Sequence, residues 1–141
     1  MPARMRQISA RRGANAMIDH VSVSVSDLER ARLFYRVVLG ALGLAELESR
    51  VTTIGFGKQY AEFWVNKRAE MAEVRVDSGA HICLRASTPQ AVDAFHVAAL
   101  QSGGTSDGKP GLRPQHGEGY YAAFIRDPDG NRIEAVTFLK R

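Results

Sequence analysis

The chain has 141 residues, which suits one domain, and its hydrophobic (45%) and charged (24%) shares are ordinary for a globular protein. Its net charge of +4 comes from four arginines in residues 1–16, a segment without acid, so the rest of the chain is neutral and lacks the basic surface of a nucleic-acid binder. No apolar run is long enough to span a membrane, and the single cysteine, Cys83, excludes an internal disulfide and favours a cytoplasmic location. We therefore expect a basic leader, residues 1–16, followed by one domain over residues 17–138.

The first predicted strand, residues 18–25, alternates between valines on one face and His20, Ser22 and Ser24 on the other. A capping box, Ser26 with Glu29, predicts that a helix begins here, and its apolar residues recur at helical spacing up to Gly40 or Gly43. Three strands are predicted to follow, at about residues 45–49, 51–56 and 60–66.

The same pattern returns sixty-one residues later. At this constant offset five pairs of residues match, which indicates a duplication: His20 with His81, Ser26 with Ser87, Phe34 with Phe95, Leu39 with Leu100 and Gly43 with Gly104. A second cap at residues 87–90 and strands at 120–126 and 131–138 complete the second unit, and the sequence Asp-Pro-Asp-Gly at 127–130 predicts the turn between those strands. Residues 106–119, rich in Gly and Pro, are expected to be an irregular functional loop.

The predicted fold is α+β, with two βαβββ repeats forming curved mixed sheets around a cleft and the helices on the outer face. The first repeat covers about residues 17–66 and the second about 79–138, and the polar stretch 66–79 links them.

The polar faces of the strands should meet in that cleft and could hold a metal ion. Glu134, between Ile133 and Ala135, is costly to bury unless it is paired or metal-bound. An insertion of 11 residues in the Gly/Pro-rich loop matches Glu62 of the first repeat to Glu134 of the second. Two histidines and two glutamates suit one divalent ion, such as Ni, Zn, Mn or Fe, as a cofactor: His20, Glu62, His81 and Glu134.

Four sequence motifs resemble the vicinal oxygen chelate superfamily, which includes glyoxalase I, fosfomycin-resistance transferases, bleomycin-binding proteins and extradiol dioxygenases. They are Ile-Asp-His-Val at 18–21, Phe-Tyr-x-x-x-Leu-Gly at 34–40, Gly-Ala-His-Ile at 79–82 and Asp-Pro-Asp-Gly-Asn-x-Ile-Glu at 127–134. The resemblance covers residues 17–138. Within the superfamily, Gly111–Pro114 and Gly119–Ala123 resemble uncharacterised glyoxalase-like proteins.

The resemblance to glyoxalase I implies that His20, Glu62, His81 and Glu134 are the metal ligands, that the two glutamates are catalytic, and that Glu134 is the base. It implies a metal-dependent lyase or isomerase that acts on a small substrate with vicinal oxygens by stabilising an enediolate. Ser24 replaces the arginine with which glyoxalase I holds glutathione. The expected substrate-binding residues are Trp64, Asn66, Tyr120, Phe124 and His116.

Two alternatives stay open. A thiol transferase of the fosfomycin-resistance type needs only two histidines and one glutamate, so Glu62 distinguishes it from glyoxalase I. A metal-free binding protein would instead hold a planar small molecule or antibiotic among the aromatic side chains of its strands. We expect a homodimer, with the site formed either within one chain or across a two-fold axis.

Overall fold

The computed structural model describes residues 17–140, so the expected leader lies outside the described residues. The first module consists of a strand, a helix and three further strands, and its sheet has the order β1-β4-β3-β2. Strand β1 runs parallel to β4, and the other neighbours are antiparallel. Its elements are β1 (Val21–Val25), α2 (Leu28–Gly40), β2 (Ala45–Ser49), β3 (Thr53–Gly57) and β4 (Ala61–Lys67).

The second module repeats this topology with the sheet order β5-β8-β7-β6, in which β5 is parallel to β8. The predicted α+β fold with two βαβββ repeats is thus confirmed. Its elements are β5 (Ile82–Arg85), α3 (Pro89–Gln101), β6 (Thr105–Leu112), the 3-10 turn η1 (Pro114–His116), β7 (Tyr120–Arg126) and β8 (Arg132–Phe138).

Strand β6 corrects the expectation that residues 106–119 are irregular throughout. The strand pairs with β7 through two register shifts, one between Ser106 and Gly108 and one between Gly108 and Gly111. The backbone of Gly108 packs closely against the Phe124 ring, so that an added Cβ would come within 2.9 Å of a ring carbon. The glycines therefore permit an irregular strand here instead of ending it.

Both helices begin one residue later than the capping-box pattern predicts. Asp27 is the N-cap of α2 and accepts a hydrogen bond from the Arg30 amide at 3.0 Å, and Thr88, at the matching position of the duplication, caps α3. The expectation that Ser26 caps α2 is wrong because its hydroxyl donates to Asp129 in the second module. No helix in the described part of the chain is long and apolar enough to cross a membrane.

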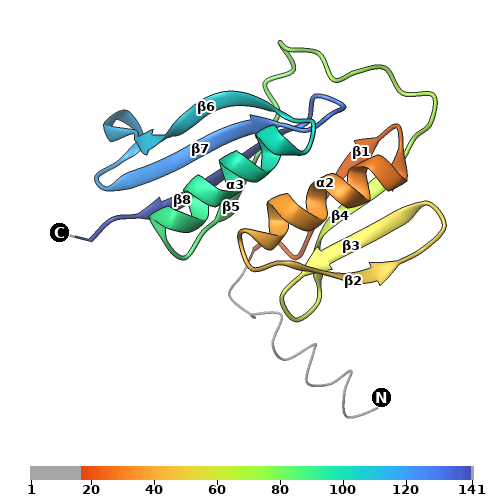
Figure 1. Cartoon of the computed structure of the whole chain (residues 1–141), viewed down its shortest axis with the longest axis horizontal. Coiled ribbons are helices and arrows are strands. Elements are labelled where there is room, and N and C mark those ends of the chain that lie inside the picture. Colours follow the sequence, from red (N-terminus) through yellow and green to blue (C-terminus); the bar gives the residue numbers. More distant parts are fainter. Residues whose placement is uncertain (1–16, 141) are drawn as a thin grey trace.

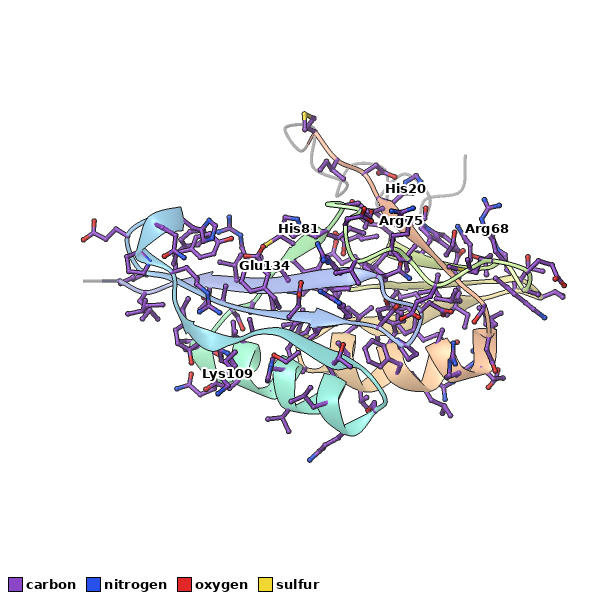
Figure 2. All side chains as sticks on the ribbon, turned by 90° about the horizontal axis from the view of Figure 1, so that it is seen from above. His20, Arg68, Arg75, His81, Lys109 and Glu134 are labelled. Carbon is purple, nitrogen blue, oxygen red and sulfur yellow. The ribbon has the colours of Figure 1, made fainter. Side chains whose placement is uncertain are left out.

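The two helices lie side by side on the same face of the two sheets (Figure 1). A single apolar core joins both modules beneath them and includes Phe34, Tyr35 and Phe95. We call the side of each sheet away from its helix the open face. The two open faces lie beside one another on one side of the molecule, and do not cover each other (Figure 2). Burial alternates along β4, with Phe63 and Val65 buried on the helix side and Trp64 half-buried on the open face.

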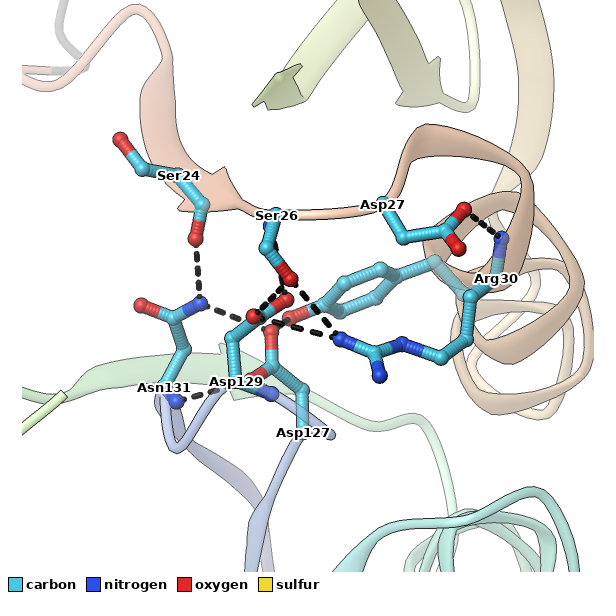
Figure 3. A network of polar contacts seen from close by, with 8 residues as sticks. Ser24, Ser26, Asp27, Arg30, Asp127, Asp129 and Asn131 are labelled. Carbon is cyan, nitrogen blue, oxygen red and sulfur yellow. Dashed lines mark hydrogen bonds and ion pairs between the residues drawn. The ribbon is translucent and has the colours of Figure 1, made fainter. Parts of the chain in front are cut away.

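The turn that joins β7 to β8 locks the second module onto the first (Figure 3). Asp129 accepts hydrogen bonds from the amide and hydroxyl of Ser26, at 3.1 and 2.6 Å. Asp127 accepts one from the Tyr35 hydroxyl at 2.6 Å, and Asn131 donates to the Ser24 carbonyl at 2.8 Å. Asp127 and Asp129 are both buried. We call this set of contacts the module joint.

Candidate functional site

The open face of the second sheet brings His81 and Glu134 together. His81 immediately precedes β5, and Glu134 lies in the adjacent parallel strand β8, opposite Cys83. Nε2 of His81 is 3.0 Å from Oε1 of Glu134. The Glu134 side chain is only 3% exposed, whereas that of His81 is 47% exposed. The structure thus brings together two of the four expected ligands, as a buried carboxylate beside an accessible imidazole.

Tyr120 completes this group, and its role is one that the sequence reasoning missed. Its hydroxyl donates a short hydrogen bond to Oε2 of Glu134, the oxygen that His81 does not approach. Burial, followed by this hydrogen bond, raises the pKa of the Tyr120 hydroxyl well above its ordinary value. Partial burial, followed by the charge of Glu134, likewise raises the pKa of the Cys83 thiol to about 12. We call His81, Tyr120 and Glu134 the Glu134 cluster.

The register of the β7–β8 hairpin was the signal that could have revealed this contact. The turn fixes Arg126 opposite Arg132, so that Phe124 faces Glu134 and Tyr120 stands two same-face positions further along β7. A tyrosine side chain at that distance can reach back across the hairpin to the carboxylate. Tyr120, which the sequence led us to expect as a substrate contact, thus contacts Glu134 in the structure.

A small pocket of about 190 Å³ opens beside the Glu134 cluster. The rings of His81 and Phe124 both line it, with their centroids 6.5 Å apart. Asp107, which is paired with Arg126 at 2.9 Å, and Arg132 provide its charged wall. The pocket has room for only a small molecule.

His116, another expected substrate contact, lies outside this pocket. It belongs to η1, and its ring packs against that of Tyr120 at a centroid distance of 5.3 Å.

The corresponding residues of the first module are not drawn into the Glu134 cluster. His20 is 53% exposed, and its Nδ1 is 2.8 Å from the Asp19 carboxylate. The half-buried Glu62 side chain makes no hydrogen bond or ion pair with any other described residue. Asn66 accepts a hydrogen bond from the Thr53 hydroxyl at 2.5 Å, and the Arg50 guanidinium lies over the Trp64 ring at 5.1 Å.

The strand registers also show that Glu62 is not the positional equivalent of Glu134. In the first module Val21 pairs with Phe63, and in the second the matching Ile82 pairs with Ile133. Trp64 therefore stands where Glu134 stands in the second module, while Glu62 corresponds to Arg132. The match inferred from an insertion of 11 residues is two residues out of register.

The donors of one chain do not suffice for a metal ion. Among residues 17–140, no three His, Cys, Asp or Glu side chains converge closely enough to hold one. His81 and Glu134 supply one imidazole nitrogen and one carboxylate oxygen, which are suitable ligand types, but a catalytic divalent ion usually takes at least three protein ligands. A metal ion held by His81 and Glu134 would therefore need at least one further ligand.

Comparison with known proteins places this fold and these motifs in one family. The model of the glyoxalase/bleomycin resistance protein/dioxygenase superfamily matches residues 17–135. The chain belongs to this superfamily. This confirms the resemblance drawn from the four sequence motifs.

Several known proteins are similar to this chain. The metallothiol transferase FosB of Shouchella clausii is 28% identical over 120 residues, which cover 85% of this chain and 79% of that protein. A glyoxalase/bleomycin resistance protein from Albidiferax ferrireducens is 32% identical with a TM-score of 0.76, and the match covers 86% of this chain and 98% of that one. A glyoxalase I variant from Zea mays shares the fold, with 22% identity, a TM-score of 0.63 and coverage of 83% and 44% of the two chains.

Proposed function

We propose that this superfamily member is a metal-dependent enzyme that opens a small oxygen-containing electrophile with a thiol or a similar nucleophile. His81 and Glu134 of one chain would be two of its metal ligands, and His20 of a second copy the third. The observation that carries the proposal is the approach of His81 to the buried Glu134 carboxylate at 3.0 Å on an open sheet face.

The chain's own residues would divide the remaining tasks. When bound, a divalent ion supplies Lewis-acid polarisation of a substrate oxygen. The Tyr120 hydroxyl donates a hydrogen bond to Oε2 of Glu134 and so fixes the orientation of the carboxylate. Phe124 and the pocket beside it exclude water from one side of the ligand, and Arg132 contributes a positive charge to the pocket wall.

Two observations favour a transferase over an isomerase of the glyoxalase I type. First, the strand register puts Trp64, and not a second glutamate, at the equivalent of Glu134, which leaves two histidines and one glutamate. Second, the similarity to a metallothiol transferase covers most of both chains. An arginine also lies beside Ser24, because Nε of Arg68 donates to the Ser24 hydroxyl at 3.0 Å, and its exposed guanidinium suits the carboxylate of a thiol cosubstrate.

Metal analysis of the full chain, purified without chelators or metal-affinity steps, tests this proposal. We expect one divalent ion per chain in the unaltered protein and in Glu62→Ala, and strong loss of metal in Glu134→Ala. Sedimentation should show a dimer, since His20 would come from the second copy. No metal in the unaltered protein, and no uptake on titration, would favour the metal-free binding protein instead.

A metal-dependent lyase or isomerase on a substrate with vicinal oxygens is the second candidate. It is favoured by the Glu62 side chain, which has no hydrogen-bond or ion-pair partner among residues 17–140. Because Val21 pairs with Phe63, Glu62 and His20 also stand at the same level of adjacent strands. Loss of metal from Glu62→Ala as severe as from Glu134→Ala would support this candidate. Turnover of the methylglyoxal hemithioacetal, compared with thiol addition to a small epoxide, separates the two reactions directly.

A further inference from the structure

The two oxygens of the Glu134 carboxylate have different partners. Oε1 lies 3.0 Å from Nε2 of His81, at the accessible side of the Glu134 cluster. Oε2 accepts the hydrogen bond from the Tyr120 hydroxyl on the opposite side. No lysine or arginine among the described residues pairs with this buried carboxylate. The phenol is therefore the donor that occupies Oε2, and only Oε1 faces His81.

Tyr120 is itself held from several sides. Its ring packs edge-on against Phe138 at 5.4 Å, with an interplanar angle of 89°. The His116 ring lies at 5.3 Å, and the Tyr120 carbonyl accepts a hydrogen bond from the Arg113 amide at 2.7 Å.

The residue before Tyr120 is fixed as well. Gly119 has a φ of +69°, and a Cβ there would collide with the Leu139 carbonyl oxygen, so only glycine lets β7 begin at this point. The phenol consequently has little freedom to follow the carboxylate if the carboxylate turns.

We infer that Tyr120 is a positioning residue that fixes Glu134 as a one-oxygen metal ligand and keeps it from acting as a mobile base. This inference rests on the proposed metal-dependent function. A carboxylate that shuttles a proton must rotate away from its ligand position, and here rotation would break the hydrogen bond from the Tyr120 hydroxyl to the buried Glu134 carboxylate. The reactions that fit the site are those in which Glu134 takes no part in proton transfer, such as the addition of an external nucleophile. This replaces the sequence-based assignment of Glu134 as the base.

Tyr121 provides a matched control within the same strand. Its side chain points to the other face of the sheet, where its hydroxyl donates to Asp93 at 2.6 Å. Tyr121→Phe therefore removes a tyrosine–carboxylate hydrogen bond of the same kind without touching the Glu134 cluster. Any difference between Tyr120→Phe and Tyr121→Phe in metal binding reports on Glu134 and not on the general loss of a hydroxyl.

The test uses the full chain, stripped of metal and titrated with Co²⁺, whose visible absorption depends on the number and type of its ligands. We expect Tyr121→Phe to match the unaltered chain. We expect Tyr120→Phe to bind Co²⁺ about 10- to 100-fold more weakly, the usual effect of losing a partner that orients a metal ligand. Its absorption spectrum should also change, because Oε2 becomes free to coordinate the ion. Circular dichroism shows whether each variant is folded.

The outcomes separate the two proposals. If all three proteins bind Co²⁺ with the same affinity and spectrum, the role of Tyr120 is refuted while the metal-dependent function stands. If the unaltered chain takes up no Co²⁺, both are refuted. Should Tyr120→Phe fail to fold, a crystal structure of the cobalt-loaded unaltered chain decides: one Glu134 oxygen on the ion and the other on Tyr120 supports the inference, and both oxygens on the ion overturn it.

Discussion

Replacing Asp129 with alanine tests how strongly the module joint stabilises the fold. The buried Asp129 carboxylate accepts two hydrogen bonds from Ser26, from the amide at 3.1 Å and the hydroxyl at 2.6 Å. Arg30 approaches it at 3.3 Å, but the arginine side chain is 47% exposed, so this ion pair contributes little. Hydrogen bonds to a charged group are worth about 1.5 kcal/mol or more each, so Asp129→Ala should lower the free energy of unfolding by about 3 kcal/mol. The total free energy of unfolding of a natural domain is about 5–15 kcal/mol, so this loss would be a large share of it.

Urea unfolding followed by circular dichroism measures the effect. A loss of about 3 kcal/mol corresponds to a fall of about 1.5 M in the urea midpoint for a protein of this size. Asp27→Ala is the control, because Asp27 also accepts a hydrogen bond near the start of α2, from the Arg30 amide at 3.0 Å, but is exposed. Loss of such an N-cap should cost only about 1 kcal/mol. If Asp129→Ala lowers the free energy of unfolding no more than Asp27→Ala does, the buried module joint stabilises the fold no more than an exposed N-cap.

Two further predictions concern groups whose pKa is shifted. Burial lowers the pKa of His96, whose Nε2 is 2.8 Å from the Ser106 hydroxyl. The folded chain therefore binds fewer protons than the unfolded chain, and stability is lost as the pH falls below about 6.5. The urea midpoint of the unaltered chain should be clearly lower at pH of about 5 than at about 7.5, and this difference should be smaller in His96→Gln. An equal difference in both proteins would show that His96 is not the group responsible. Since the pKa of Cys83 is raised to about 12, its thiol should react with Ellman's reagent at mildly alkaline pH far more slowly in the folded chain than in urea; equal rates would show that the thiol is not perturbed.

Much of the fold followed from local patterns in the sequence. The alternation of valines with His20, Ser22 and Ser24 correctly separated the two faces of β1, and the constant offset between the repeats predicted the second module. Strand β6 was missed because glycines such as Gly108 and Gly111 usually weaken a strand, whereas here Gly108 permits close contact with Phe124 of β7. The assignment of Ser26 as a cap failed because its partner, Asp129, lies more than a hundred residues away in the chain.

The candidate site was predictable to the extent that it depends on one module. His81 and Glu134 were expected to meet, and they do so across two adjacent parallel strands. The equivalence of Glu62 and Glu134 depended on counting an insertion, and only the pairing of β1 with β4 shows that the count is two residues out. The contact between Tyr120 and Glu134 required the hairpin register together with the reach of a long side chain.

The module joint also bears on how such a duplicated protein can arise. Its acids come from only one of two equivalent turns: the β7–β8 turn supplies Asp127 and Asp129, whereas the β3–β4 connection at residues 58–60 reads Lys-Gln-Tyr. The hydroxyls that donate hydrogen bonds to these acids, those of Ser26 and Tyr35, belong to the other half. The two halves have become complementary after starting as copies, so that neither half retains on its own the contacts that now join them. We therefore expect that an isolated half of this chain would not be a stable protein.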